Sequence, residues 1–141
     1  MLIAWPWHDA MAVDACAEGA LAPVRIADGD TLQLSWLGKV NGRMAGDIGA
    51  AFEAHRRRTT AVELALQFVR GGTEDMSAAI GVLKQIKATH KLTTVVEPGA
   101  TCASACIPIF LASDHRRAAM SSLWYFHRSW LHKLTAASMP C

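Results

Sequence analysis

Two residues of the chain have the types and spacing of a nucleophile and its base. Ser104 lies in the run Cys102-Ala-Ser-Ala-Cys106, shortly after Pro98-Gly99, and His127 follows the apolar run 123–126. A serine at the start of a helix lies near the positive end of the helix dipole, which stabilises developing negative charge. A histidine one crossover away can take the proton of its hydroxyl. The structural alternatives are a helix-capping serine and a packed or surface histidine.

A third feature that could do chemistry is the pair Gly71-Gly72, which follows a strand pattern and precedes a helix pattern. Paired glycines allow positive φ and leave backbone N–H groups free to bind an oxygen. A tight strand-to-helix turn without any function is the alternative.

The cysteines leave several readings open. Cys102 and Cys106 are four residues apart, and on a regular helix their Cβ atoms would be too far apart for an unstrained disulfide. We therefore expect buried small apolar packing. The alternatives are a disulfide formed by an unwound first turn, a zinc site with His115, and a cysteine nucleophile. Cys16 and Cys141 have no evident partners.

An alternation of strands and helices must position these groups. The predicted elements, in order, are strand 32–36, helix 44–55, strand 62–69, helix 74–90, strand 92–96, a helix from about residue 102, a polar turn over 113–117 and a strand over 118–126. This order predicts an α/β fold whose parallel strands are joined by right-handed crossovers, with working groups beyond their carboxyl ends. Pro108 is expected to kink the last helix. Arg56, Arg57 and Arg58 are expected to form a solvated helix end, with anion binding as the alternative.

The composition restricts the classes of function. The chain has 141 residues, enough for one domain, and its 52% apolar and 18% charged residues exclude a disordered chain. A net charge of +2 excludes a protein held on nucleic acid mainly through phosphates. Four cysteines are too few for a small disulfide scaffold. No apolar stretch approaches the roughly 20 residues of a membrane-spanning helix.

Residues 1–30 are predicted to form a leader or a poorly ordered extension, and residues 31–141 the folded domain. Asp9, Asp14 and Glu18 interrupt the apolar residues near the start, so no secretory signal is predicted in the sequence as written. The alternative is a start codon inside or downstream of a longer gene's export segment. The compartment is left open.

The order Gly-Gly at a strand end, small-Ser-small at a helix start, and then a strand-terminal histidine resembles the ClpP-type serine peptidases of the ClpP/crotonase superfamily. The segment 95–106, Val-Val-Glu-Pro-Gly-Ala-Thr-Cys-Ala-Ser-Ala-Cys, is similar to exported bacterial ClpP-like proteins that bear a Cys-Ala-Ser-Ala-Cys segment. The resemblance extends from about Thr31 to His127.

This resemblance implies repeated β-α units with a mainly parallel sheet, in a fold whose carboxyl-terminal part is truncated. It implies that Ser104 is the nucleophile and His127 its base, and that the N–H groups of Gly72 and Ala105 form an oxyanion hole. Gly71 and Thr73 would then line a groove for an extended peptide. Peptide or protein substrates and a homo-oligomer are expected, and no cofactor or metal is expected. Proteins of the resembled family are often exported to the periplasm, but no signal peptide is predicted here and the localisation stays open.

The sequence departs from the pattern of this family in its acid. Fourteen residues follow His127 and none is Asp or Glu. The chain could work as a Ser-His dyad, or use Asp114 or another acid, or be an inactive relative that serves as a binding or assembly module. A further alternative is acyl-CoA chemistry in the manner of crotonases, which would use the glycine oxyanion hole without Ser104 and His127.

Overall fold

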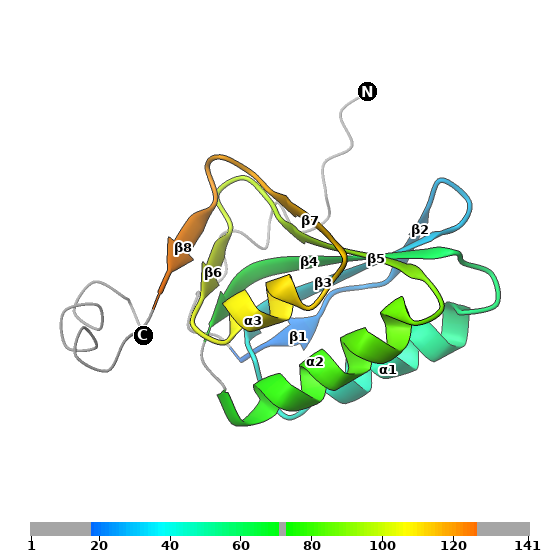
Figure 1. Cartoon of the computed structure of the whole chain (residues 1–141), viewed down its shortest axis with the longest axis horizontal. Helices are drawn as coiled ribbons and strands as arrows, with labels where there is room; N and C mark the ends of the chain where they lie inside the picture. Colours follow the sequence, from blue (N-terminus) through cyan, green and yellow to red (C-terminus); the bar gives the residue numbers. More distant parts are fainter. Residues whose placement is uncertain (1–17, 71–72, 127–141) are drawn as a thin grey trace.

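The computed structural model describes residues 18–70 and 73–126. Its elements are β1 (Ala20–Leu21), β2 (Arg25–Ala27), β3 (Thr31–Lys39), α1 (Met44–His55), β4 (Ala61–Arg70), α2 (Thr73–Lys87), β5 (Lys91–Val96), β6 (Thr101–Ala103), α3 (Cys106–Leu111), β7 (His115–Ala118) and β8 (Leu123–Tyr125). The strands follow the order β1-β3-β4-β5-β7, with β2 beside β3, and β6 lies between β4 and β8 (Figure 1).

The central strands are parallel, as the alternation of elements predicts. β3 pairs with β4 through Leu34 and Leu64, and β4 pairs with β5 through Leu64 and Thr94. Parallel neighbours need a crossover, which α1 and α2 supply. The predicted helix 44–55 coincides with α1, and the predicted helix 74–90 is α2 with slightly different ends.

Helices α1 and α2 lie side by side against one face of the sheet (Figure 1). Alternate residues of the strands point towards them, because side chains along a strand alternate between its two faces. The core contains the largest fully buried side chains of this layer: Leu32, Leu34, Trp36, Met44, Ile48, Leu64, Leu66, Leu83, Ile86 and Leu92. α2, at 15 residues, is the longest of the described helices, and none of them has the length and apolarity to cross a membrane.

The sheet begins earlier than the domain boundary predicted at residue 31. Residues 18–30 were expected in a leader or extension, yet β1 and β2 pair antiparallel with β3. Gly19 is required here, because a Cβ at this position would clash with the carbonyl oxygen of Lys39 and the indole of Trp36. Asn41 Nδ2 also donates to the carbonyl of Gly19, at 2.9 Å. Residues 1–17 lie outside the described part of the chain.

The carboxyl-terminal elements differ from the prediction. The segment 113–117, expected as a polar turn, contains most of β7, and the strand expected over 118–126 is the separate β8. β7 is the exposed last strand of the sheet, paired with β5 through its backbone. Its charged side chains gave no alternating pattern, although charges are common on edge strands.

Candidate active site

Ser104 lies where β6 ends and α3 has not yet begun. β6 pairs parallel with β4 through Cys102 and Val69, and with β8 through Ala103 and Tyr125. Residues 100–106 are buried except for Ser104, which is partly exposed. The nucleophile candidate therefore stands at the carboxyl ends of parallel strands, the edge at which the alternating pattern predicts working groups.

The backbone of Ser104 is in the left-handed region, with φ of 52°. This conformation costs a residue other than glycine about 1–2 kcal/mol. Two hydrogen bonds hold it: the Ser104 N–H donates to the Tyr125 carbonyl at 3.0 Å, and the Ser104 carbonyl accepts from the Ile107 N–H at 3.0 Å. Within the described part of the chain, the Ser104 hydroxyl makes no hydrogen bond, unlike the hydroxyl of Ser113.

The predicted position of Ser104 inside the first turn of a helix is wrong. The helix starts at Cys106, with Ala105 as its N-cap residue and no side-chain capping hydrogen bond. The capping role that was the structural alternative for Ser104 is therefore excluded. The reason is tertiary: the segment 101–103 pairs with two neighbouring strands and is drawn out of the helix.

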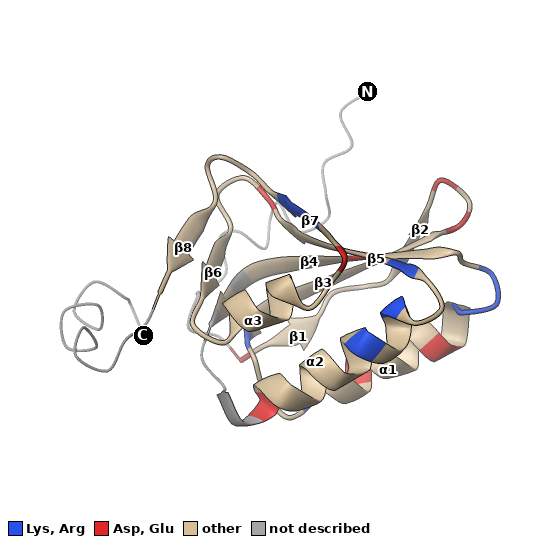
Figure 2. Ribbon diagram, in the orientation of Figure 1, with Lys and Arg blue, Asp and Glu red and all other residues tan. Residues whose placement is uncertain are grey.

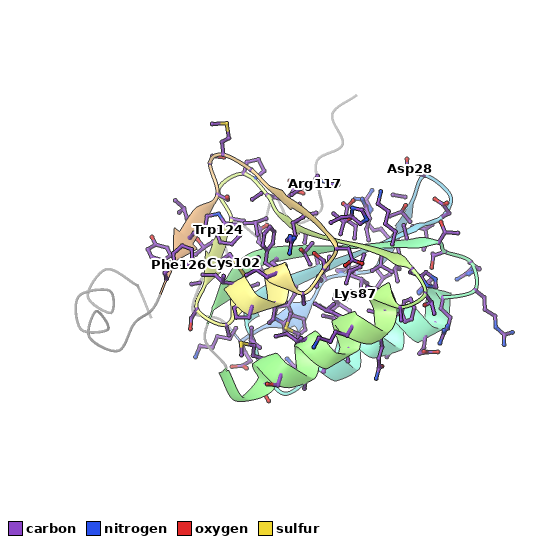
Figure 3. The ribbon with its side chains drawn as sticks, in the orientation of Figure 1. Asp28, Lys87, Cys102, Arg117, Trp124 and Phe126 are labelled. Carbon is purple, nitrogen blue, oxygen red and sulfur yellow. A yellow bond between two sulfur atoms is a disulfide. The ribbon has the colours of Figure 1, made fainter. Side chains whose placement is uncertain are left out.

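The favoured expectation of two unlinked cysteines is also wrong, and the alternative of a disulfide between them is confirmed. Cys102 and Cys106 form a disulfide, with their Cα atoms 5.3 Å apart. The prediction assumed a continuous helix through both residues, whereas Cys102 is in β6 and Cys106 opens α3. Because both sulfur atoms are in this bond, neither can bind zinc or act as a thiolate nucleophile. Figure 3 shows Cys102 beside α3, with Trp124 of β8 close by.

The kink predicted from Pro108 assumed that this residue lies in the interior of a helix. Pro108 is the third residue of α3, in the first turn, where backbone N–H groups have no partner inside the helix. The missing N–H of proline therefore costs α3 no hydrogen bond there. The Ser104 carbonyl, to which residue 108 would otherwise donate its N–H, accepts a hydrogen bond from the Ile107 N–H instead.

The remaining predicted site residues are placed only in part. Ala105 is 2% exposed, and its backbone N–H donates to no acceptor among residues 18–70 and 73–126. Thr73 is the first residue of α2. Gly71, Gly72 and His127 lie outside the described residues, so their predicted roles are untested.

The two acids nearest in sequence to Ser104 have different surroundings. Asp114 precedes β7 at its amino end, with its carboxylate 3.7 Å from Lys87 Nζ, so it does not lie at the strand ends that carry Ser104. Glu97 follows β5 at its carboxyl end. Burial raises the pKa of Glu97, with a smaller contribution from Glu63, while Arg117 acts in the opposite direction.

No charged residue belongs to the three elements around Ser104. β6, α3 and β8 contain neither Lys, Arg, Asp nor Glu, and Figure 2 shows all three in tan. A weakly polar neighbourhood strengthens hydrogen bonds to a developing oxyanion. It also supplies no carboxylate for acid-base chemistry.

The arginine run lies at the other end of the parallel strands, between α1 and β4. Arg56 pairs with Glu53 at 2.9 Å and stacks over the ring of Phe52, 5.3 Å from its centroid. Arg57 and Arg58 line an open depression beside them. This agrees with a solvated helix end, and anion binding there is untested.

Sequence reasoning missed two parts of this site. One is the Tyr125 carbonyl, which binds the Ser104 N–H and joins β8 to the turn. The other is the strand-to-helix change between the two cysteines, which the sequence suggested only through the alternative of a disulfide formed by an unwound first turn.

Comparison with solved structures identifies the fold. An enoyl-CoA hydratase from Mycobacterium avium subsp. paratuberculosis K-10 is 20% identical, with a TM-score of 0.58, over 74% of this chain and 46% of its own. One from Bacillus halodurans is 11% identical, with a TM-score of 0.57, over 72% of this chain and 51% of its own. One from Bacillus anthracis is 13% identical, with a TM-score of 0.56, over 83% of this chain and 52% of its own.

The chain thus spans about half the length of the hydratases it matches. No protein-family profile matches it, and no curated protein is significantly similar. At these identities the likeness concerns the fold, and it confirms the predicted α/β architecture with a mainly parallel sheet. The chain has a crotonase-like fold.

Proposed function

We propose that the protein is a serine hydrolase that cleaves peptide or other acyl bonds with Ser104 as its nucleophile. The observation that carries this proposal is the backbone of Ser104, with φ of 52° at a strand-to-helix turn and the one partly exposed position of a buried segment. A serine on such a sharp, strained turn presents its Oγ to a substrate, as in the nucleophile elbow of other hydrolases.

The strand register supports His127 and Gly72 as its partners. The strand β8 ends at Tyr125, whose carbonyl binds the Ser104 N–H, and His127 follows two positions later in the sequence. β4 pairs with β6 at Val69, near its own end, and Gly71-Gly72 follow β4 directly. The carboxyl ends of parallel strands lie at the same edge of a sheet, so β4 and β8 end on the side of the sheet where Ser104 follows β6, and Gly71-Gly72 and His127 come next in the sequence.

In the proposed reaction, His127 takes the proton of the Ser104 hydroxyl as Oγ attacks the acyl carbon. The carbonyl oxygen becomes an oxyanion and accepts hydrogen bonds from the N–H groups of Gly72 and Ala105. Collapse of this intermediate expels the leaving group, which takes the proton from His127. Water then enters by the same steps and releases the acid. Gly71 and Thr73 would line a groove for an extended substrate.

The acyl-CoA alternative draws on the names of the solved structures with this fold, which are enoyl-CoA hydratases. Adding water across a carbon–carbon double bond needs a general base and a general acid. The elements β6, α3 and β8 supply no carboxylate for this purpose. A hydrolase that uses a hydroxyl fits these residues better. A non-catalytic binding module remains the second alternative, because no acid is assigned to orient His127.

The test is labelling with a fluorophosphonate, followed by mapping of the modified residue by mass spectrometry. We expect label on Ser104, none on the Ser104→Ala variant, and a labelling rate at least about 100-fold lower in His127→Ala. Ser121→Ala is the matched control, since Ser121 is an exposed serine outside the site, and it should label normally. An unlabelled wild-type protein that hydrates an enoyl-CoA, and still does so as Ser104→Ala, would refute the proposal in favour of the hydratase.

We also propose that the protein self-associates through the region around β8. Leu111, Met120, Leu123 and Phe126 are exposed large apolar side chains, and they lie in the segment from the last residue of α3 to the residue after β8 (Figure 3 labels Phe126). Clusters of this kind mark interaction surfaces. Sedimentation should show an oligomer that Leu123→Glu with Phe126→Glu disperses, and a monomeric wild type would contradict this.

A further inference from the structure

The disulfide encloses Ser104 in a small covalent ring. Cys102 is the central residue of β6 and Cys106 is the first residue of α3, four positions later, so the bond joins the two elements on either side of Ser104. Both cysteines are 0% exposed. Ser104 is thus the exposed point of a ring whose sulfur atoms face the core.

Apart from the pairing of β6 with β4 and β8 and the burial of its neighbours, this turn has few local restraints. α3 has six residues, and a helix so short is not stable by itself. It also starts without a side-chain cap. Among the described residues, two hydrogen bonds hold the Ser104 backbone: its N–H donates to the carbonyl of Tyr125, and its carbonyl accepts from the N–H of Ile107. A non-glycine residue at positive φ persists only where its surroundings over-determine it.

We propose that the Cys102–Cys106 disulfide is a positioning device that keeps Ser104 in its left-handed conformation and its hydroxyl directed out of the buried turn. This inference rests on the proposed role of Ser104 as the nucleophile. Opening the ring lets the turn relax towards negative φ and lowers the reactivity of Ser104, while the sheet and its two long helices stay folded. Their core of Trp36, Leu64 and Leu83 belongs to other elements.

The first measurement is the rate of fluorophosphonate labelling before and after reduction. Tris(2-carboxyethyl)phosphine supplies two electrons, water supplies two protons and the oxygen of the phosphine oxide, and the disulfide becomes two thiols. We expect the maximal labelling rate to fall at least about tenfold while the half-saturating probe concentration changes little, since a misplaced nucleophile reacts slowly but leaves the binding surface intact. Reoxidation restores the rate, and the double variant Cys102→Ala, Cys106→Ala behaves like the reduced protein.

A matched control separates positioning from loss of stability. Ile48→Val removes one methylene from α1, far along the chain from the ring, and keeps the disulfide. It lowers stability without touching the turn, so its folded population should label at the wild-type rate. Equal slowing in Ile48→Val and in the reduced protein would overturn a positioning role.

The second measurement does not depend on catalysis. Hydrogen exchange of the Ser104 N–H, which is bonded to Tyr125, should accelerate at least about tenfold on reduction, while exchange of the Leu64 N–H in β4 stays unchanged. Unaltered exchange at Ser104 together with unaltered labelling would overturn the proposal. An oxidised protein that never labels would refute the nucleophile itself, and the exchange data would then show alone whether the disulfide holds the turn.

Discussion

Replacing Ser104 by glycine and by alanine gives a direct measure of the backbone conformation at the site. Both variants lack the hydroxyl, so their difference in stability reports the main chain. At φ of 52°, an alanine carries a cost of about 1–2 kcal/mol that glycine avoids. Glycine gives back about 0.4–1 kcal/mol through the greater freedom of its unfolded chain. We therefore expect Ser104→Gly to be more stable than Ser104→Ala by about 0.5–1 kcal/mol.

The assay is equilibrium unfolding in urea of the oxidised variants, with free energies compared at a common slope. Ala50 offers a matched control, because it is exposed in the middle of α1, where alanine is favoured. Ala50→Gly should lose about 1 kcal/mol, the usual cost of glycine in a helix. The sign of the change from alanine to glycine should thus be opposite at the two positions.

A Ser104→Ala variant as stable as Ser104→Gly, or more so, would refute the reasoning. It would mean that residue 104 does not have positive φ in solution. The strained turn would then no longer support a nucleophile at this position. A flattened difference only in the reduced protein would instead agree with the proposed role of the disulfide.

Three further predictions concern the fold around the site. Because burial raises the pKa of Glu97, the native state binds the proton of this carboxyl more tightly than the unfolded state does. The free energy of unfolding should therefore fall as pH rises above the usual glutamate pKa of about 4.3. Urea unfolding across a pH series should show a weaker dependence on pH in Glu97→Gln, and an unchanged dependence would contradict this. Thr94→Val removes the 2.7 Å hydrogen bonds of the buried Thr94 hydroxyl to the Phe110 carbonyl and the Ser113 hydroxyl, and should lower the free energy of unfolding by about 1–3 kcal/mol in the same assay. A decrease below about 0.5 kcal/mol would contradict this prediction. Gln67 is 1% exposed and its amide has no partner in the described part of the chain, so Gln67→Met should raise stability by about 1 kcal/mol, and destabilisation would indicate an unseen partner.

The central sheet and its two long helices could be predicted from local patterns. Leu32, Leu34 and Trp36 alternate with polar residues, and each of the three is buried in β3. The three-to-four spacing of Met44 and Ile48 marks the buried face of α1. Such patterns can be read from a sequence because an element with one buried face repeats its apolar residues at its own structural period.

The turn around Ser104 could not be predicted in this way. Apolar and small residues fill the segment from Cys102 to Ala112, so no period separates its strand from its helix. β7 was missed for a related reason, since the charged residues of an exposed edge strand follow no burial pattern and its pairing with β5 uses backbone atoms alone. Pairing partners distant in sequence decided both boundaries.

The amino-acid sequence alone determined the α/β class and the order of the central elements, because residue type and spacing carry that information directly, and it singled out Ser104 as a candidate nucleophile. Tertiary structure decided the left-handed backbone of Ser104, the disulfide around it and the hydrogen bond from its N–H to Tyr125. Each of these depends on β6 pairing with β4 and β8. The paired residues Val69 of β4 and Tyr125 of β8 lie 35 and 21 positions from Ser104 in the chain, and only the folded sheet brings these strands to the serine.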